Sequence, residues 1–139
     1  MSGKDHKVAA LLEGVETGPH DPHFAGYIRC FNERKFYEAH DVLEALWLQD
    51  RNGPDGDFFK GLIQFAGAFV HLQKQRSRPA SKLFRLCAIY LAKYPSPHLA
   101  LDVANILRLA KHWDEAARAL GREGDLLAEQ TPPTLRLQT

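Results

Sequence analysis

The sequence has few of the features that mark a membrane or secreted protein. No apolar run approaches the roughly 20 residues that a membrane-spanning helix needs. The N-terminus also lacks a basic segment followed by an apolar stretch, which a secretory signal would have. These absences predict a soluble, cytoplasmic protein with no membrane partner.

Cysteine is equally scarce. The chain has two, Cys30 and Cys87, which are far apart and form no C-x-x-C spacing. Each falls on the apolar side of a predicted helix. We therefore expect two small buried hydrophobic residues rather than a disulfide or a pair of metal ligands.

The alternating pattern of a half-buried strand is missing throughout the chain. Apolar residues recur instead three and four positions apart, with turn residues between the periodic segments. This pattern predicts five helices, over residues 22–31, 36–49, 57–75, 79–94 and 102–120. Short connections place consecutive helices side by side, so the expected fold is all-α, a small antiparallel bundle built from helical hairpins.

A chain of 139 residues is long enough for one domain with a real core. Residues 1–20 are weakly patterned and predict a poorly ordered N-terminal segment. Residues 21–121 form the single helical domain. Residues 122–139 are polar and contain Pro132-Pro133, so we expect a tail that is mobile or draped on the surface.

Acidic residues are absent from the middle of the chain. Residues 58–101 hold seven Lys and Arg and no acid, whereas residues 1–57 hold eleven acids and six Lys and Arg. The basic side chains gather around the turn between the third and fourth predicted helices: Lys74, Arg76, Arg78, Lys82 and Arg85. Such a cluster could bind phosphate or nucleic acid. The aromatics nearby lie on core stripes, which favours a solvated turn that attracts an acidic neighbour or a second subunit.

One motif, His40-x-x-x-Glu44-x-x-Trp47, places chemically versatile side chains along one helix. His40 and Glu44 are one turn apart, so their side chains can meet. A histidine in an apolar stripe is costly to bury unless its ring nitrogens are bonded. Glu44 can serve one nitrogen, and the expected partner of the other is Gln64 or His71 on the next helix. Tyr37 and Asp41 are predicted on the outer side, beyond Glu44.

Three interpretations of this motif stay open. It can be a buried polar staple between two helices. It can be a divalent-metal site, which would need a third ligand such as His71 or Gln64. It can be an acid–base pair in which Glu44 tunes His40. The chain lacks a nucleophile motif, a glycine-rich phosphate loop and a second carboxylate pair, so we lean against an enzyme. Trp47 is expected in the core, with its indole N–H close to a carboxylate.

These residues also resemble a known family. The segments that carry the resemblance are Phe31-Asn32, Phe36 to Trp47, Phe59 to Ala66, His71-Leu72, Tyr94-Pro95 and Leu101 to Val103. Over about residues 24–110 the chain is similar to the bacterial and archaeal "domain of unknown function 309" family. The resemblance implies a small all-α fold. It also implies that His40, Glu44 and Trp47 are the family's hallmark positions, for which metal binding has been suggested without an established activity.

A looser likeness is to tetratricopeptide-type helix pairs. In each of two helical hairpins, the helix after the turn has an alanine near its start, Ala39 in one and Ala80 in the other. This likeness favours an alternative function, a protein- or nucleic-acid-interaction module that uses its hairpins and the basic turn at 74–85. A homodimer formed through exposed apolar residues of the outer helices is also open.

Overall fold

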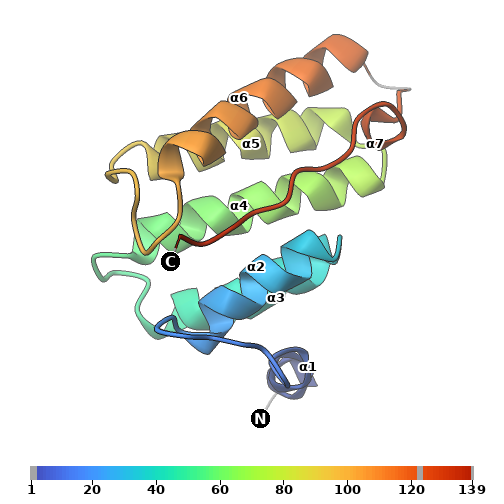
Figure 1. Ribbon diagram of the computed structural model, residues 1–139. Helices are drawn as coiled ribbons and strands as arrows, with labels where there is room; N and C mark the ends of the chain where they lie inside the picture. Colours follow the sequence, from blue (N-terminus) through green and yellow to red (C-terminus); the bar gives the residue numbers. More distant parts are fainter. Residues whose placement is uncertain (1–2, 122–123, 139) are drawn as a thin grey trace.

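The structure, a computed structural model, describes residues 3–121 and 124–138, and that part of the chain is helical (Figure 1). Its helices are α1 (Gly3–Leu11), α2 (Pro22–Asn32), α3 (Phe36–Gln49), α4 (Gly56–Gln73), α5 (Ser77–Leu91), α6 (Val103–Leu120) and the short α7 (Leu126–Glu129). Extended pairing in the described residues is limited to isolated bridges between His98 and Leu101 and between Leu101 and Leu137. The all-α prediction is confirmed.

Consecutive helices pack against each other as hairpins. The pairs α2–α3, α3–α4, α4–α5 and α5–α6 all lie in contact, and α1 packs on α3. Figure 1 shows α4, α5 and α6 in succession, with α2 and α3 on the other side of α4. The central position of α4 agrees with its sequence, because apolar residues cover two adjoining faces of this helix.

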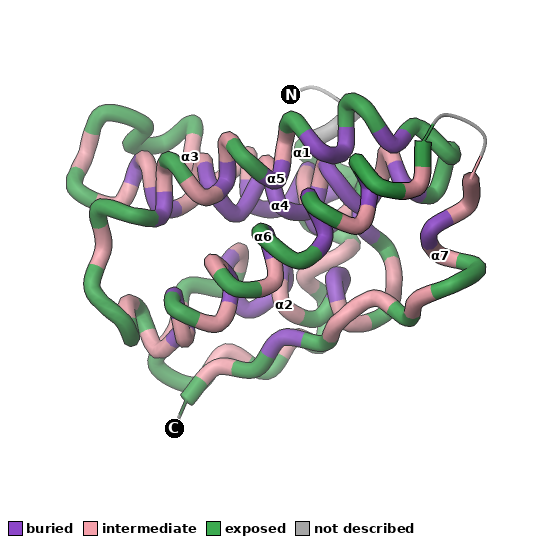
Figure 2. The backbone as a smooth tube through the Cα atoms, turned by 90° about the horizontal axis from the view of Figure 1, so that it is seen from above, coloured by how far each residue is buried: buried purple, intermediate pink, exposed green. Residues whose placement is uncertain are grey.

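Aromatic rings fill the core around α4. The ring centroids of Phe31 and Phe65 lie 5.4 Å apart. The ring centroid of Phe69 lies 5.2 Å from that of Phe84 and 5.0 Å from that of Trp113. These rings come from α2, α4, α5 and α6. The ring of Phe36 adds α3, since its centroid lies 5.1 Å from that of Phe69, so five helices meet at one aromatic cluster. Figure 2 shows the buried residues following α4 and the inner faces of its neighbours. Ring pairs at these distances add to the free energy of burial.

Both cysteines are free and buried, as expected from the sequence. Burial raises the pKa of both thiols, and Glu33 adds to the effect at Cys30. A raised pKa keeps a thiol protonated and unreactive. Cys30 and Cys87 are therefore core residues.

Side chains and proline set the beginnings of the helices. The Asp21 carboxylate accepts a hydrogen bond from the His23 N–H at 2.7 Å, and Asp102 accepts one from Asn105 at 3.0 Å. The sequence predicts that Pro79 opens the fourth of its helices, but α5 begins at Ser77. The first-turn N–H groups of a helix have no partner within it, so proline is tolerated after the first position.

The predicted end of that helix at residue 94 is also wrong, because α5 ends at Leu91. Tyr94 serves a different purpose. Its hydroxyl donates to the carbonyl of Pro54 at 2.8 Å and accepts from the N–H of Phe58 at 3.0 Å. Tyr94 thereby ties the segment after α5 to the start of α4.

The C-terminal segment runs across the bundle between α2 and α6 (Figure 1). The Asn32 side chain holds it by two hydrogen bonds, donating to the Leu135 carbonyl at 2.8 Å and accepting from the Leu135 N–H at 2.7 Å. Arg34 donates to the Pro133 carbonyl at 2.8 Å. Backbone and side-chain bonds together therefore position this segment.

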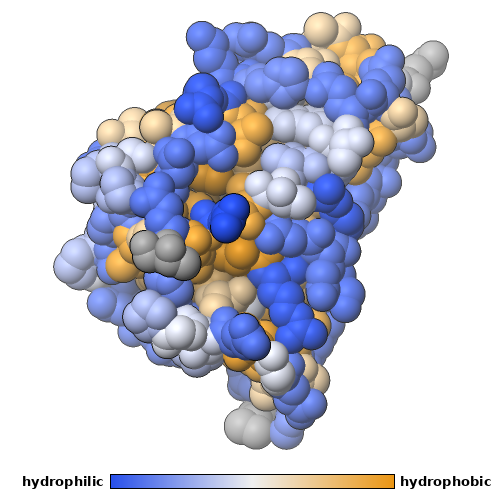
Figure 3. Space-filling view, viewed as in Figure 1, coloured by the Kyte–Doolittle hydropathy of each residue, from blue (hydrophilic) through white to orange (hydrophobic). Residues whose placement is uncertain are grey.

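A groove of about 980 Å³ lies between residues 14–20, α2 and the C-terminal segment. Apolar side chains dominate its walls, and Arg29 and Arg136 also line it. Figure 3 shows apolar surface in the middle of this face of the molecule, with hydrophilic surface around it. Among the helices that the structure describes, none combines the length and apolarity needed to cross a lipid bilayer.

Candidate functional site

The imidazole of His40 lies between two carboxylates of its own helix, α3. Its Nδ1 is 3.2 Å from Asp41 Oδ1, and its Nε2 is 4.0 Å from Glu44 Oε2. The side chains of His40 and Glu44 are 30% and 27% exposed, so the pair is half-buried rather than sealed in the core. Both contacts stay within α3, as the one-turn spacing of His40 and Glu44 allows.

The helix that faces His40 presents a glycine. A Cβ added to Gly67 of α4 would lie 3.9 Å from His40 Cδ2 and 3.2 Å from Leu83 Cδ1. The His40 ring therefore lies near the α4 backbone at Gly67, between the positions of Gln64 and His71. No hydrogen bond joins His40 to either of these two side chains, although all three residues are in the described part of the chain.

His71 has a distinct environment. Its Nδ1 is buried and has no hydrogen-bond partner in the described structure. Burial lowers the pKa of its imidazole, and the positive charges of Arg76 and Lys74 lower it further. His71 is accordingly a neutral imidazole at pH 7.

The expected outer position of Asp41 is wrong, because its side chain is only 5% exposed. Helix α1 packs against α3, and Lys7 Nζ lies 5.2 Å from the centre of the Tyr37 ring. Tyr37 itself is 52% exposed, with its ring 6.3 Å from that of His40. The sequence pattern of residues 1–20 is too weak to place a helix on this side of α3.

Trp47 lies at the margin of the core and is partly exposed. The ammonium group of Lys60, on α4, lies 4.4 Å from the centre of its ring. This distance is within the range of a cation–π interaction. The third hallmark residue therefore joins α3 to α4 through Lys60.

The carboxylates around His40 are poorly arranged for a metal ion. Asp41 contacts Nδ1 and Glu44 faces Nε2, so the two carboxylates lie toward opposite edges of the ring. Within residues 3–121 and 124–138, no group of three His, Cys, Asp or Glu side chains is placed to hold a metal ion. Zinc and iron sites in proteins use three or more such ligands.

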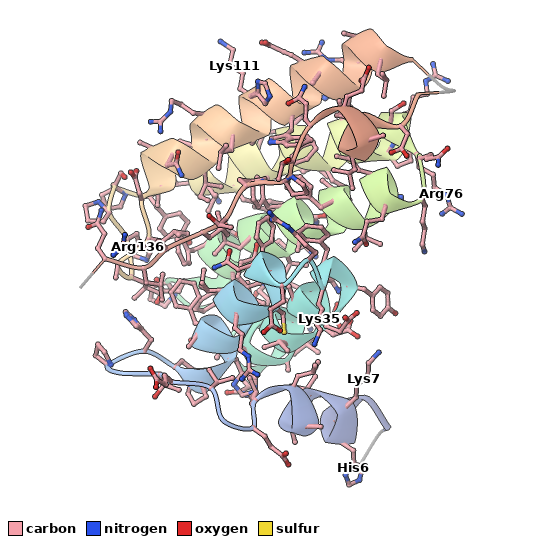
Figure 4. The ribbon with its side chains drawn as sticks, turned by 45° about the vertical axis from the view of Figure 1, so that its right-hand side comes forward. His6, Lys7, Lys35, Arg76, Lys111 and Arg136 are labelled. Atoms are coloured by element: carbon pink, nitrogen blue, oxygen red, sulfur yellow. The ribbon has the colours of Figure 1, made fainter. Side chains whose placement is uncertain are left out.

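The basic residues predicted at the α4–α5 turn separate into two groups. Arg78, Lys82 and Arg85 line a pocket of about 650 Å³ between α5 and α6. Lys74 and Arg76 do not line it, and Figure 4 shows Arg76 projecting away from the bundle at the turn. The other residues that line this pocket, named here the α5–α6 pocket, are Ser77, Ser81, Ala117, Arg118 and Gly121.

One buried carboxylate, that of Asp114 on α6, borders the α5–α6 pocket. Its side chain is 8% exposed and accepts a hydrogen bond from Ser81 Oγ. Arg118 contacts both of its oxygens, with Nε 3.2 Å from Oδ1 and a terminal nitrogen 3.2 Å from Oδ2. Arg85 Nε is farther away, at 3.9 Å. Asp114 therefore holds Arg118 at the edge of the pocket.

Two cations of the α5–α6 pocket are uncompensated. In the described part of the chain, Arg78 and Lys82 take part in neither an ion pair nor a hydrogen bond through their side chains. Among the described residues, four cationic side chains thus line the pocket, and the Asp114 carboxylate borders it. The sequence identifies three of the four. It misses Arg118, because that residue reaches the pocket only through the packing of α6 on α5.

Comparison with known proteins identifies one family. Residues 24–83 match the family described as "Domain of unknown function (DUF309)". No curated protein and no solved structure matches the chain. The matched residues cover most of α2, all of α3 and α4, and the first part of α5, and they include the motif of His40, Glu44 and Trp47. Residues 24–83 of this chain are thus similar to the DUF309 family, a likeness that covers less than half of its 139 residues.

Proposed function

We propose that this protein binds an anionic ligand in the α5–α6 pocket. The observation that carries the proposal is the charge around that pocket: among the described residues, Arg78, Lys82, Arg85 and Arg118 line it, and the paired carboxylate of Asp114 lies beside Arg118. Cations concentrated at a concave surface raise the local potential and attract anions. An interaction module with a basic turn at residues 74–85 is the alternative function that the sequence predicts. The proposed function takes up the basic turn of that alternative.

The state of Asp114 supports the proposal. A carboxylate beside a pocket would repel an anion if its charge were free. Here the carboxylate is bonded to Ser81 and Arg118, so its charge is largely balanced. Arg78 and Lys82, which have no partner among the residues that the structure describes, stay available to a ligand.

The proposal is tested by thermal unfolding in the presence of phosphate, sulfate, citrate or a single-stranded oligonucleotide, each compared with sodium chloride at equal ionic strength. We expect at least one polyvalent anion to raise the Tm in a saturable manner, since ligands that bind the folded state stabilise it. The double variant Arg78→Gln/Lys82→Gln should lose this response.

Lys111→Gln is the matched control, because Lys111 is an exposed cation of α6 that points away from the bundle (Figure 4). It should respond like the wild type. A panel in which no anion stabilises the protein beyond chloride would rule out the proposed function.

A divalent-metal site at His40 and Glu44 is the second candidate function. The observation in its favour is that His40 Nε2 and Glu44 Oε2 are 4.0 Å apart on a half-exposed surface. An ion held by two protein ligands keeps water in its remaining positions and binds weakly. Calorimetric titration of untagged protein with Mn²⁺ or Zn²⁺ tests this. Binding that persists unchanged in both His40→Ala and Glu44→Gln would exclude the site.

A further inference from the structure

We infer that the ligand of the α5–α6 pocket is a small phosphate-type dianion, either inorganic phosphate or the phosphate group of a monoester. This inference rests on the proposed function, because it names the ligand class of the same site. A nucleic acid is the principal competing ligand, since it also presents phosphate charge to basic side chains.

The cations converge from one face of α5. Arg78, Lys82 and Arg85 are four and three residues apart, a spacing that aligns side chains along one side of a helix. All three line the pocket together with Arg118 of α6. A compact ligand in the pocket can therefore meet cations from two helices, and a dianion gains more from this arrangement than a monoanion does.

The backbone N–H groups at the start of α5 add partial positive charge beside the pocket. Helix α5 begins at Ser77, and Arg76 provides no side-chain cap. The first backbone hydrogen bond of the helix is donated by Ala80 to the Arg76 carbonyl at 3.2 Å, and Pro79 has no N–H. The N–H groups of Ser77 and Arg78 have no acceptor within the helix. Both residues line the pocket, and helix N-termini favour anions.

The hydroxyl groups of the pocket are already committed as donors. Ser77 Oγ donates to the Gly121 carbonyl at 2.7 Å, and Ser81 Oγ donates to Asp114. Neither serine hydrogen is directed to a ligand. Recognition therefore depends on ionic contacts and backbone N–H groups, which favours a ligand with two negative charges over a neutral polar molecule.

The lining residues argue against a nucleic acid. The described residues that line the α5–α6 pocket include no aromatic side chain, and proteins that bind single strands stack the bases on aromatic side chains. Its volume of about 650 Å³ is typical of small-molecule sites. On the α6 side the small residues Ala117 and Gly121 lie beside Arg118, so the space is open to a compact group.

In the described part of the chain, the charged groups at the pocket are Arg78, Lys82, Arg85 and Arg118, with Asp114 beside them, and no histidine lines it. The dianion of a phosphate monoester takes up one proton, and becomes a monoanion, at a pKa of about 6. Phosphate binding should therefore weaken as the pH falls from about 8 to about 5.5, because the dianion is lost. Sulfate stays doubly charged over this range, so its binding should change much less.

Isothermal titration calorimetry with inorganic phosphate, sulfate and a single-stranded thymidine oligonucleotide at fixed ionic strength tests the inference. We expect saturable phosphate binding that Lys82→Gln weakens about tenfold or more, the effect of losing one charge-assisted contact. Arg78→Gln should act similarly, and Lys111→Gln should bind phosphate like the wild type. The Tm of each variant shows whether it is folded.

The alternative outcomes are distinct. Oligonucleotide binding that phosphate does not compete with would overturn the inference while leaving an anion-binding function in place. Phosphate binding that Lys111→Gln weakens as much as Lys82→Gln, or that does not depend on pH, would also overturn it. Absence of binding by all three anions would overturn both the inference and the proposed function.

Discussion

At the scale of single residues, the neighbours of His40 follow from sequence spacing only in part. Glu44 faces its ring because the two are one turn apart. Asp41, the next residue in the chain, contacts Nδ1 of the His40 ring. The sequence pattern predicts Asp41 on the outer side of the helix. The difference arises because α1 packs on α3, a contact between segments whose sequence gives little indication of it.

His71 predicts a pH dependence of stability. Burial, Arg76 and Lys74 hold its pKa below the unfolded value of about 6.5. The folded state then binds fewer protons than the unfolded state. The contribution of neutral His71 to the free energy of unfolding is therefore complete above the unfolded pKa and is lost as the pH falls through the folded pKa. Urea midpoints measured from about pH 7.5 to about pH 5 should fall more in the wild type than in His71→Gln. Equal losses in the two proteins would contradict this assignment.

At the scale of helices, two glycines of α4 lie at contacts with its neighbours. A Cβ at Gly61 would lie 2.9 Å from Leu91 Cγ and 3.2 Å from Tyr90 Cβ, close to the stems of both side chains. A Cβ at Gly67 would meet Leu83 Cδ1 at 3.2 Å, which is the end of a side chain that can move. Gly61 therefore determines how closely α5 approaches α4.

This contrast predicts that two matched substitutions differ in their effect on stability. Gly61→Ala should reduce the free energy of unfolding by about 1–3 kcal/mol through overpacking, a loss that exceeds the helix-propensity gain of up to about 1 kcal/mol. Gly67→Ala should stay within about 1 kcal/mol of the wild type, because Leu83 can give way. Chemical unfolding measures both. A Gly61→Ala protein as stable as Gly67→Ala would show that α5 can shift.

The C-terminal segment predicts a local effect. Asn32→Ala removes both hydrogen bonds to Leu135, and each such bond contributes about 0.5–1.5 kcal/mol. Hydrogen exchange at the Leu135 amide should accelerate, since the side-chain Oδ1 of Asn32 is its acceptor. Asn52→Ala, in the exposed loop before α4, should leave that rate unchanged. An unaltered rate in Asn32→Ala would mean that other contacts hold the segment.

At the scale of the whole molecule, local periodicity predicted the helical bundle and the central position of α4. The helix ends were less predictable. Pro79 is compatible with more than one position in the first turn, and the tertiary contacts of Tyr94 replace a further turn of α5. The α5–α6 pocket required knowledge of packing. Its α5 cations are visible as a basic segment, but Arg118 and Asp114 come from a helix more than 20 residues later.

The central claim is that this pocket, rather than basic surface in general, binds a phosphate dianion. Backbone amide chemical shifts, followed by NMR while inorganic phosphate is added at constant ionic strength, test it most directly. We predict saturable changes concentrated in residues 77–85 of α5 and 117–121 at the end of α6. Changes spread evenly over the exposed Lys and Arg residues, or concentrated at Lys74, Arg76 or Arg136 outside the pocket, would contradict the claim.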